Sequence, residues 1–165
     1  MKKSILLFLS ILISFISFSQ IDVNTLSEND KKIVKVFRET YVEKKFKDPY
    51  SFQLLKLETK PITFGDWDLN DIIYLKSQLE KKDFKYVKEN ELIDRIKLKE
   101  DSYSKMSDEI KKTIKSYEVK LDCYGSNSYG GKVLSRYKFN YVVLDLNMNP
   151  IDYYNGNNLY VTEIK

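Results

Sequence analysis

Histidine is absent from the 165 residues of this chain, and cysteine occurs once, at Cys123. Without histidine, the Ser-His-Asp and Cys-His catalytic arrangements and histidine-ligated zinc are excluded. A single cysteine excludes an intrachain disulfide and a thiolate metal cluster. We therefore expect a fold held by its hydrophobic core, with no cofactor and no metal site.

The sequence opens with a segment typical of bacterial export signals. Two lysines precede an apolar run over residues 5–18, and Ser17 and Ser19 are small residues at the two positions that signal peptidase reads. The run is shorter than the roughly 20 apolar residues of a transmembrane helix, which favours a cleaved signal over an anchor. The sequence thus predicts that residues 1–19 are a signal peptide and that cleavage occurs before Gln20.

The remaining residues 20–165 have a length typical of one domain. No cysteine lies near the end of the apolar run, so we expect an exported, periplasmic or secreted protein that is not a lipoprotein. We expect no stable membrane insertion after cleavage. Two of the 28 basic residues leave with the signal, so 26 face 24 acidic residues. Their alternation is typical of a solvated surface and gives no indication of nucleic-acid binding.

The first half of the mature chain shows the 3.6-residue period of amphipathic helices. Ser27 and Asp30 resemble a capping box that begins a helix, and Asp48-Pro49 ends it. A strand bounded by Pro61 is expected next. The segment after it is expected to be a loop up to Asp68, which would cap a second helix. These patterns predict that helices make up the N-terminal and central parts of the domain.

Weaker helical patterns follow over residues 81–100 and from Ser107. At Tyr117 the hydrophobic period changes from 3.6 to 2, which indicates strands. Two long strands are expected on either side of the loop 124–131, and shorter strands separated by turns follow. The sequence therefore predicts an α+β fold, with N-terminal and central helices packed on a C-terminal antiparallel meander sheet.

Cys123 is the one thiol that could be reactive. The alternation of the strand places it on the same face as Tyr117, Val119 and Leu121, and free cysteine is among the most buried residue types. No histidine is present to lower its pKa. We therefore predict a buried, inert cysteine.

The segment Asp145-Leu-Asn147-Met-Asn149 copies the first three ligand positions of an EF-hand calcium loop. However, Pro150 replaces the glycine that such a loop needs at its sixth position, and Gly156 replaces the final glutamate. The same residues suit a tight turn between strands. A turn is therefore predicted here and no metal site.

The loop 124–131 is the strongest candidate for a binding site. It combines glycines with Tyr124, Asn127 and Tyr129, and Arg136 follows on the next strand. Binding residues concentrate in loops on rigid scaffolds, and tyrosine and arginine are frequent hot spots. These four residues are predicted to bind a protein or glycan partner, with a plain hairpin connection as the other interpretation.

Two short stretches resemble small exported bacterial proteins of uncharacterised function. They are Asp48-Pro49-Tyr50-Ser51-Phe52 and Asn127-Ser128-Tyr129-Gly130-Gly131, which match a D-P-x-S-F stretch and an N-S-x-G-G stretch before the last strands of those proteins. The resemblance implies export and an α+β domain. It implies no activity and no catalytic residue.

The leading hypothesis is a non-enzymatic binding or interaction domain of the cell envelope or medium, with an inhibitor or immunity-type role as one instance. The alternative is a carboxylate-dependent hydrolase acting on envelope or extracellular polymers, because a lack of histidine does not exclude it. A purely structural envelope protein is a third class. No catalytic residue is predicted, and the sequence leaves the partner and the oligomeric state open.

Overall fold

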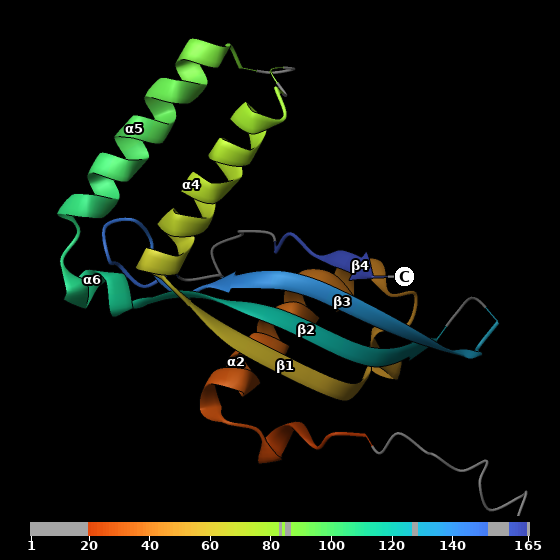
Figure 1. The fold of residues 1–165 in the computed structure, drawn as a ribbon. Coiled ribbons are helices and arrows are strands. Elements are labelled where there is room, and N and C mark those ends of the chain that lie inside the picture. The colour runs from red at the N-terminus through yellow and green to blue at the C-terminus, as the bar shows by residue number, and fades with distance from the viewer. Residues whose placement is uncertain (1–19, 83, 85–86, 127–128, 152–158, 165) are drawn as a thin grey trace, which may run out of the picture.

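The computed structural model describes residues 20–82, 84, 87–126, 129–151 and 159–164. The expected signal peptide and Asn127 lie outside these ranges. Helices and a four-stranded antiparallel sheet form an α+β fold, as the sequence predicts (Figure 1).

The sheet is a meander in which consecutive strands are antiparallel neighbours. Its strands are β1 (Gln53–Thr63), β2 (Ile114–Ser126), β3 (Lys132–Val142) and β4 (Thr162–Ile164). The expectation that a loop begins at Tyr124 is wrong, because the ladder continues to Ser126. Tyr124 pairs with Leu134, and Ser126 pairs with Lys132. The connection between β2 and β3 is therefore shorter than the sequence suggests.

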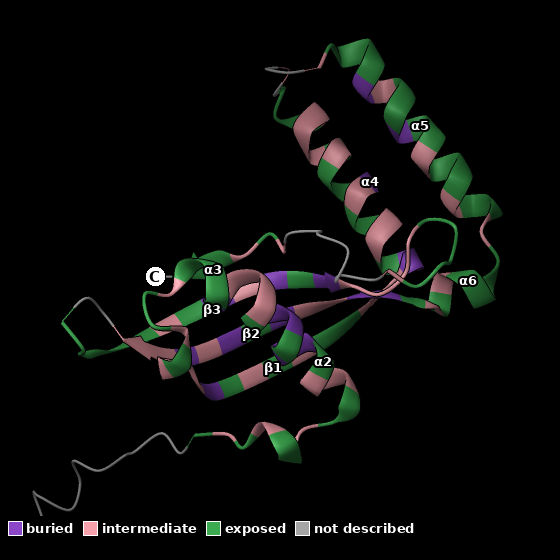
Figure 2. Ribbon diagram, turned by 180° about the vertical axis from the view of Figure 1, so that it is seen from behind, coloured by how far each residue is buried: buried purple, intermediate pink, exposed green. Residues whose placement is uncertain are grey.

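The N-terminal helical segment covers one face of the sheet (Figure 2). Its elements are η1 (Val23–Thr25), α2 (Glu28–Phe37), the π-helical stretch η2 (Arg38–Val42), α3 (Glu43–Lys45) and η3 (Pro49–Ser51). The expected cap is confirmed, because the Ser27 hydroxyl accepts a hydrogen bond from the Asp30 backbone N–H (3.1 Å). The cap satisfies one of the free N–H groups at the start of α2.

Two long helices, α4 (Phe64–Glu80) and α5 (Glu89–Lys105), are inserted between β1 and β2. We call this antiparallel pair the arm, and it rises from one end of the sheet (Figure 1). No helix among the described residues is long and apolar enough to cross a membrane.

The start of α4 differs from the expectation that Asp68 is its cap. The helix begins earlier because Thr63 and Asp66 form a capping box. The Asp66 N–H donates to Thr63 Oγ1 (3.1 Å), and the Thr63 N–H donates to Asp66 Oδ2 (3.2 Å). Since Thr63 already supplies the cap, Asp68 lies within the helix and its carboxylate is available to the arm.

The segments that join the arm to the sheet also show one correction. Pro61 lies inside β1 and does not bound it, because β1 is an edge strand, where a missing N–H is tolerated. Beyond the arm, the short helix expected from Ser107 is confirmed as α6 (Asp108–Lys112). Its Ser107 cap accepts a hydrogen bond from the Ile110 N–H (3.3 Å), and the chain then enters β2.

The core lies between α2 and the sheet. Val119, Leu121 and Cys123 share the helix-facing side of β2 and are fully buried, which confirms the predicted alternation. The rings of Phe37 and Phe139 stack with centroids 5.3 Å apart. The buried cluster consists of Ile33, Val34, Val36, Phe37, Val42, Leu54, Val119, Leu121, Cys123, Tyr137, Phe139 and Tyr141. Because these residues alternate along the strands, their neighbours form the opposite face.

Candidate functional site

The face of the sheet opposite α2 is not covered by any described helix (Figures 1 and 2). We call it the open face. Its charged residues are Lys56, Glu58, Lys60, Glu118, Lys120, Asp122, Lys132, Arg136 and Lys138. Six basic and three acidic side chains leave an excess of three positive charges.

Ion pairs between strands organise the open face. Arg136 and Asp122 are register partners, and the guanidinium donates two parallel hydrogen bonds to the carboxylate (2.7 and 2.8 Å). Lys138 Nζ lies 2.8 Å from the carboxylate of Glu118. Bidentate pairs fix the orientation of both side chains. The Arg136 guanidinium is therefore held in place on the sheet.

The three carboxyl groups of this face all have a lowered pKa. The main cause for Asp122 and for Glu118 is the hydrogen bond from the basic partner. Glu58 has a lowered pKa for the same reason, since Lys56 lies 2.6 Å away. A hydrolase with a carboxylic acid as proton donor needs one carboxyl with a raised pKa. These three groups are ionised at neutral pH and are suited to binding through fixed charges.

A hollow of about 270 Å³ lies at the centre of the open face. Its lining residues are Lys56, Glu58, Lys120, Asp122, Arg136 and Ile164. Lys120 forms no ion pair with any carboxylate of the described residues, since Glu58 is paired with Lys56. An anionic group that entered this hollow would meet the Lys120 ammonium.

The structure places two of the four predicted binding residues together. Tyr124 and Arg136 both lie on the open face, and Lys132 Nζ lies 5.7 Å from the centre of the Tyr124 ring. Tyr129 lies in the β2–β3 connection and is 96% exposed. Asn127 lies outside the described residues. The predicted surface is thus centred on the strands, with Tyr129 at its end.

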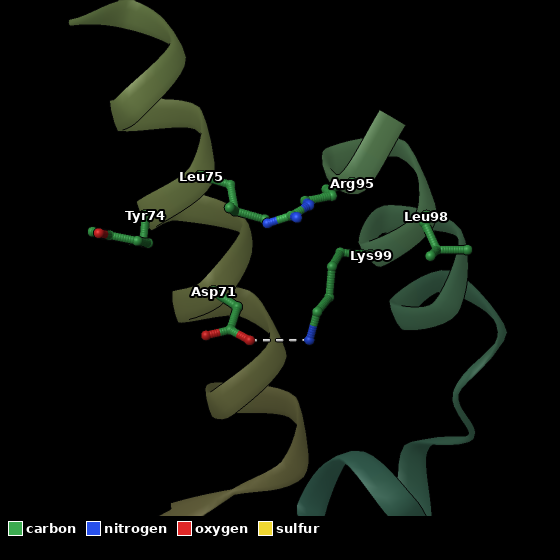
Figure 3. A pocket seen from close by; sticks show the side chains of 6 residues that line it. All are labelled: Asp71, Tyr74, Leu75, Arg95, Leu98 and Lys99. Atoms are coloured by element: carbon green, nitrogen blue, oxygen red, sulfur yellow. Dashed lines mark hydrogen bonds and ion pairs between the residues drawn. The ribbon is translucent and has the colours of Figure 1, made fainter. Parts of the chain in front are cut away.

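A groove between the two helices of the arm was not predicted (Figure 3). It has a volume of about 340 Å³ and is lined by Asp71, Tyr74, Leu75, Arg95, Leu98 and Lys99. These residues follow the same i, i+3, i+4 spacing on both helices. That spacing was visible in the sequence, but the pairing of the two helices was not.

One end of the groove is closed by an ion-pair cluster. Lys99 Nζ lies 3.0 Å from Asp71 and 3.4 Å from Asp68. The hydrogen bond to Asp71 is the main cause of a raised pKa at Lys99. The cluster joins α4 to α5 and holds the base of the groove together.

Lys115 is a buried cation at the base of the arm, with 7% of its surface exposed. Its ammonium lies 4.4 Å from the centre of the Trp67 ring and 5.2 Å from that of Phe64. Burial lowers its pKa. Cation–π contacts of this kind stabilise a desolvated cation. We interpret Lys115 as a structural link between β2 and α4.

Cys123 is fully buried, as the strand alternation predicts. Burial raises the pKa of its thiol to about 12. The thiolate is the reactive form of cysteine, and it is therefore scarce at neutral pH. Cys123 is consequently part of the core and not of a catalytic site.

The calcium-loop-like segment is a turn, as expected. Asp145 Oδ1 accepts hydrogen bonds from the N–H groups of Asn147 (2.7 Å) and Asn149 (2.9 Å). This side-chain capping is typical of an Asx turn. Within the described ranges, no group of three or more histidine, cysteine, aspartate or glutamate side chains is arranged to hold a metal ion.

Comparisons of the chain with models of known protein families, with curated proteins and with solved structures find no match. Function is therefore inferred from the side chains of the open face and of the arm.

Proposed function

We propose that this chain is an exported, non-enzymatic binding domain of the cell envelope or medium. It holds a protein or glycan partner on the open face and the adjacent β2–β3 connection. An inhibitor or immunity-type role is one form that such binding takes. The export part of the proposal is based on the lysines, the apolar run and the small residues of the first 19 positions.

The observation that carries the binding part is the charged, uncovered open face. Its carboxylates are ionised, and Arg136 is held in a bidentate pair. Tyr124 and Tyr129 add aromatic surface at one end. Pre-ordered aromatic and arginine side chains bind partners at a low entropic cost. This favours recognition over acid–base chemistry at the same residues.

The test begins with affinity capture from the envelope fraction of the producing bacterium and identification of the captured component. Binding of the purified component to Tyr124→Ala, Tyr129→Ala and Arg136→Ala is then measured by calorimetry. We expect each variant to bind at least about tenfold more weakly. Tyr129→Ala should leave the melting temperature unchanged, because that side chain is 96% exposed.

Arg38→Ala is the matched control, because Arg38 is exposed and belongs to the helical side of the sheet. It should bind as the unsubstituted protein does. Normal binding by all three test variants would show that the open face is not the binding surface. Release of reducing ends from envelope polysaccharides by the pure protein would instead favour the hydrolase.

A further inference from the structure

The groove of the arm has two large apolar side chains that are exposed to solvent. Tyr74 on α4 is 60% exposed and Leu98 on α5 is 70% exposed, and both line the groove. None of the buried residues of the arm lines the groove; they are Phe64, Gly65, Ile72, Leu92 and Ile96. Two packed helices leave a groove into which the ridge of a third helix fits. The arm therefore offers an unfilled packing position.

Ion pairs join the two helices of the arm at two places. Lys99 pairs with Asp71, and Lys76 Nζ lies 2.6 Å from Glu100. Arg95 is one turn before Lys99 on α5. It forms no ion pair with any carboxylate of the described residues.

The residue that Arg95 faces explains the missing pair. Figure 3 shows its guanidinium directed across the groove towards Leu75, which is one turn after Asp71 on α4. Lys99 is paired with a carboxylate on α4, whereas Arg95 is directed towards a leucine on the same helix. The groove thus combines a permanently charged guanidinium with an aliphatic floor.

We propose that this groove binds an amphipathic helix of a partner protein, with apolar residues on Tyr74, Leu75 and Leu98 and an acidic residue on Arg95. The lining residues lie within about one turn of each helix, residues 71–75 of α4 and 95–99 of α5, so the groove extends about 6 Å along the arm. Leucine side chains complement aliphatic and aromatic residues, which favours a peptide over a sugar chain. This helix-in-groove site is separate from the open face and does not depend on the function proposed for it.

The test uses the full mature chain and a displayed library of amphipathic helical peptides. The peptides share one leucine stripe, and the flanking positions vary among glutamate, lysine and glutamine. We expect selection to enrich glutamate beside the stripe. The best synthetic peptide should bind Arg95→Gln and Leu98→Asp at least about tenfold more weakly, which corresponds to about 1.4 kcal/mol.

Ile73→Asp is the control, because Ile73 is an apolar residue of α4 that is 56% exposed but does not line the groove. It should bind the peptide normally. A charge exchange gives a second test: Arg95→Glu should bind a peptide in which lysine replaces the selected glutamate. Circular dichroism should show the same helix content in every variant.

Three results would overturn the proposal. The first is a selection that enriches no peptide, or peptides without an acidic residue. The second is equal binding by Leu98→Asp and Ile73→Asp. The third is displacement of the peptide by dodecanoate at similar concentrations, which would assign the groove to acyl chains.

Discussion

At the scale of single residues, the lack of a side chain at Gly125 lets β2 pack against the ring of Phe46. A Cβ at this position would lie 2.8 Å from Phe46 Cε2, which is closer than carbon atoms pack. Phe46 is itself held against Phe52 and Tyr137, with ring centroids 6.3 and 6.2 Å away. The lack of a side chain at Gly125 therefore allows the strand to lie under the Phe46 ring.

We expect Gly125→Ala to lower the free energy of unfolding by about 1–3 kcal/mol, because the methyl group displaces a packed ring. Gly130→Asn is the control. Nothing lies within 4 Å of a Cβ at Gly130, and asparagine tolerates its positive φ of 77°. Urea denaturation of both variants measures the difference. Equal midpoints would show that Phe46 moves aside without cost.

The Cys123 thiol provides a prediction about alkaline stability. Its folded pKa is about 12, and the unfolded value is about 8.5. Between these two pKa values the folded protein keeps the thiol proton while the unfolded chain releases it. The contribution of the buried thiol to the free energy of unfolding is therefore fully present below pH ~8.5, and it is lost as the pH rises towards the folded pKa. Between these limits the unfolding free energy should fall by up to about 1.4 kcal/mol per pH unit more steeply than in Cys123→Ala.

Urea titrations at several alkaline pH values compare the two proteins. Tyr137 also has a pKa raised to about 12 by burial, but both proteins contain it, so its effect cancels. A thiol reagent should label native Cys123 only after unfolding. Parallel pH dependences, or rapid labelling of the folded protein, would contradict the burial of this thiol.

At the scale of elements, the start of α4 depends on a short local motif. Thr63 and Asp66 satisfy one another's backbone groups, and the chain turns from β1 directly into the helix. Phe64 and Gly65, the first two helical residues, are buried against the neighbouring segments. The cap therefore fixes where the arm leaves the sheet.

Thr63→Ala should lower the free energy of unfolding by about 1 kcal/mol, because an N–H at the start of α4 loses its acceptor. Asn70→Ala, at an exposed position inside the same helix, is the control and should be neutral or slightly stabilising. Chemical denaturation followed by circular dichroism measures both. A larger loss from Asn70→Ala would contradict the assigned cap.

The accuracy of the sequence-based predictions differs from element to element. Alternation in β2 was sufficient to place Cys123 in the core, because the side-chain period of a strand is two. The glycine, serine and tyrosine at residues 124–126 were typical of a loop. Their pairing with β3 is a tertiary effect that outweighs this preference.

The two surfaces were predictable to different degrees. Arg136 was a candidate from the sequence because it follows a distinctive loop on an alternating strand; its role in binding stays a prediction. Arg95 and Leu98 were not, since their role depends on α4 lying alongside α5. Hydrophobic periodicity identifies the side of a helix that is buried, but it does not identify the neighbouring helix.

At the scale of the whole molecule, the expected mature N-terminus lies next to the folded sheet. The Ile21 N–H donates a hydrogen bond to the Leu54 carbonyl (2.8 Å) beside the free edge of β1. Ile21, Val23 and Leu26 are partly buried against the core. The residues that directly follow the expected cleavage point therefore contribute to packing.

We predict that the exported protein begins at Gln20 or within two residues of it. Intact mass and N-terminal sequencing of the protein from the periplasm or medium measure this directly. A mature chain that retains Met1 would contradict the signal peptide. A start beyond Leu26 would contradict the contribution of this segment to the core.

The insertion of the arm between β1 and β2 has a consequence for the order of folding. Thr63 and Ile114 are register partners, so the two ends of the arm meet at the sheet. Closing a flexible loop of about 50 residues costs about 3.5 kcal/mol of chain entropy, and contacts so distant in sequence form slowly. If the arm forms first from its local contacts, its ends are already close together. A preformed arm would then hold the end of β1 close to the start of β2 and lower the entropic cost of pairing the two strands.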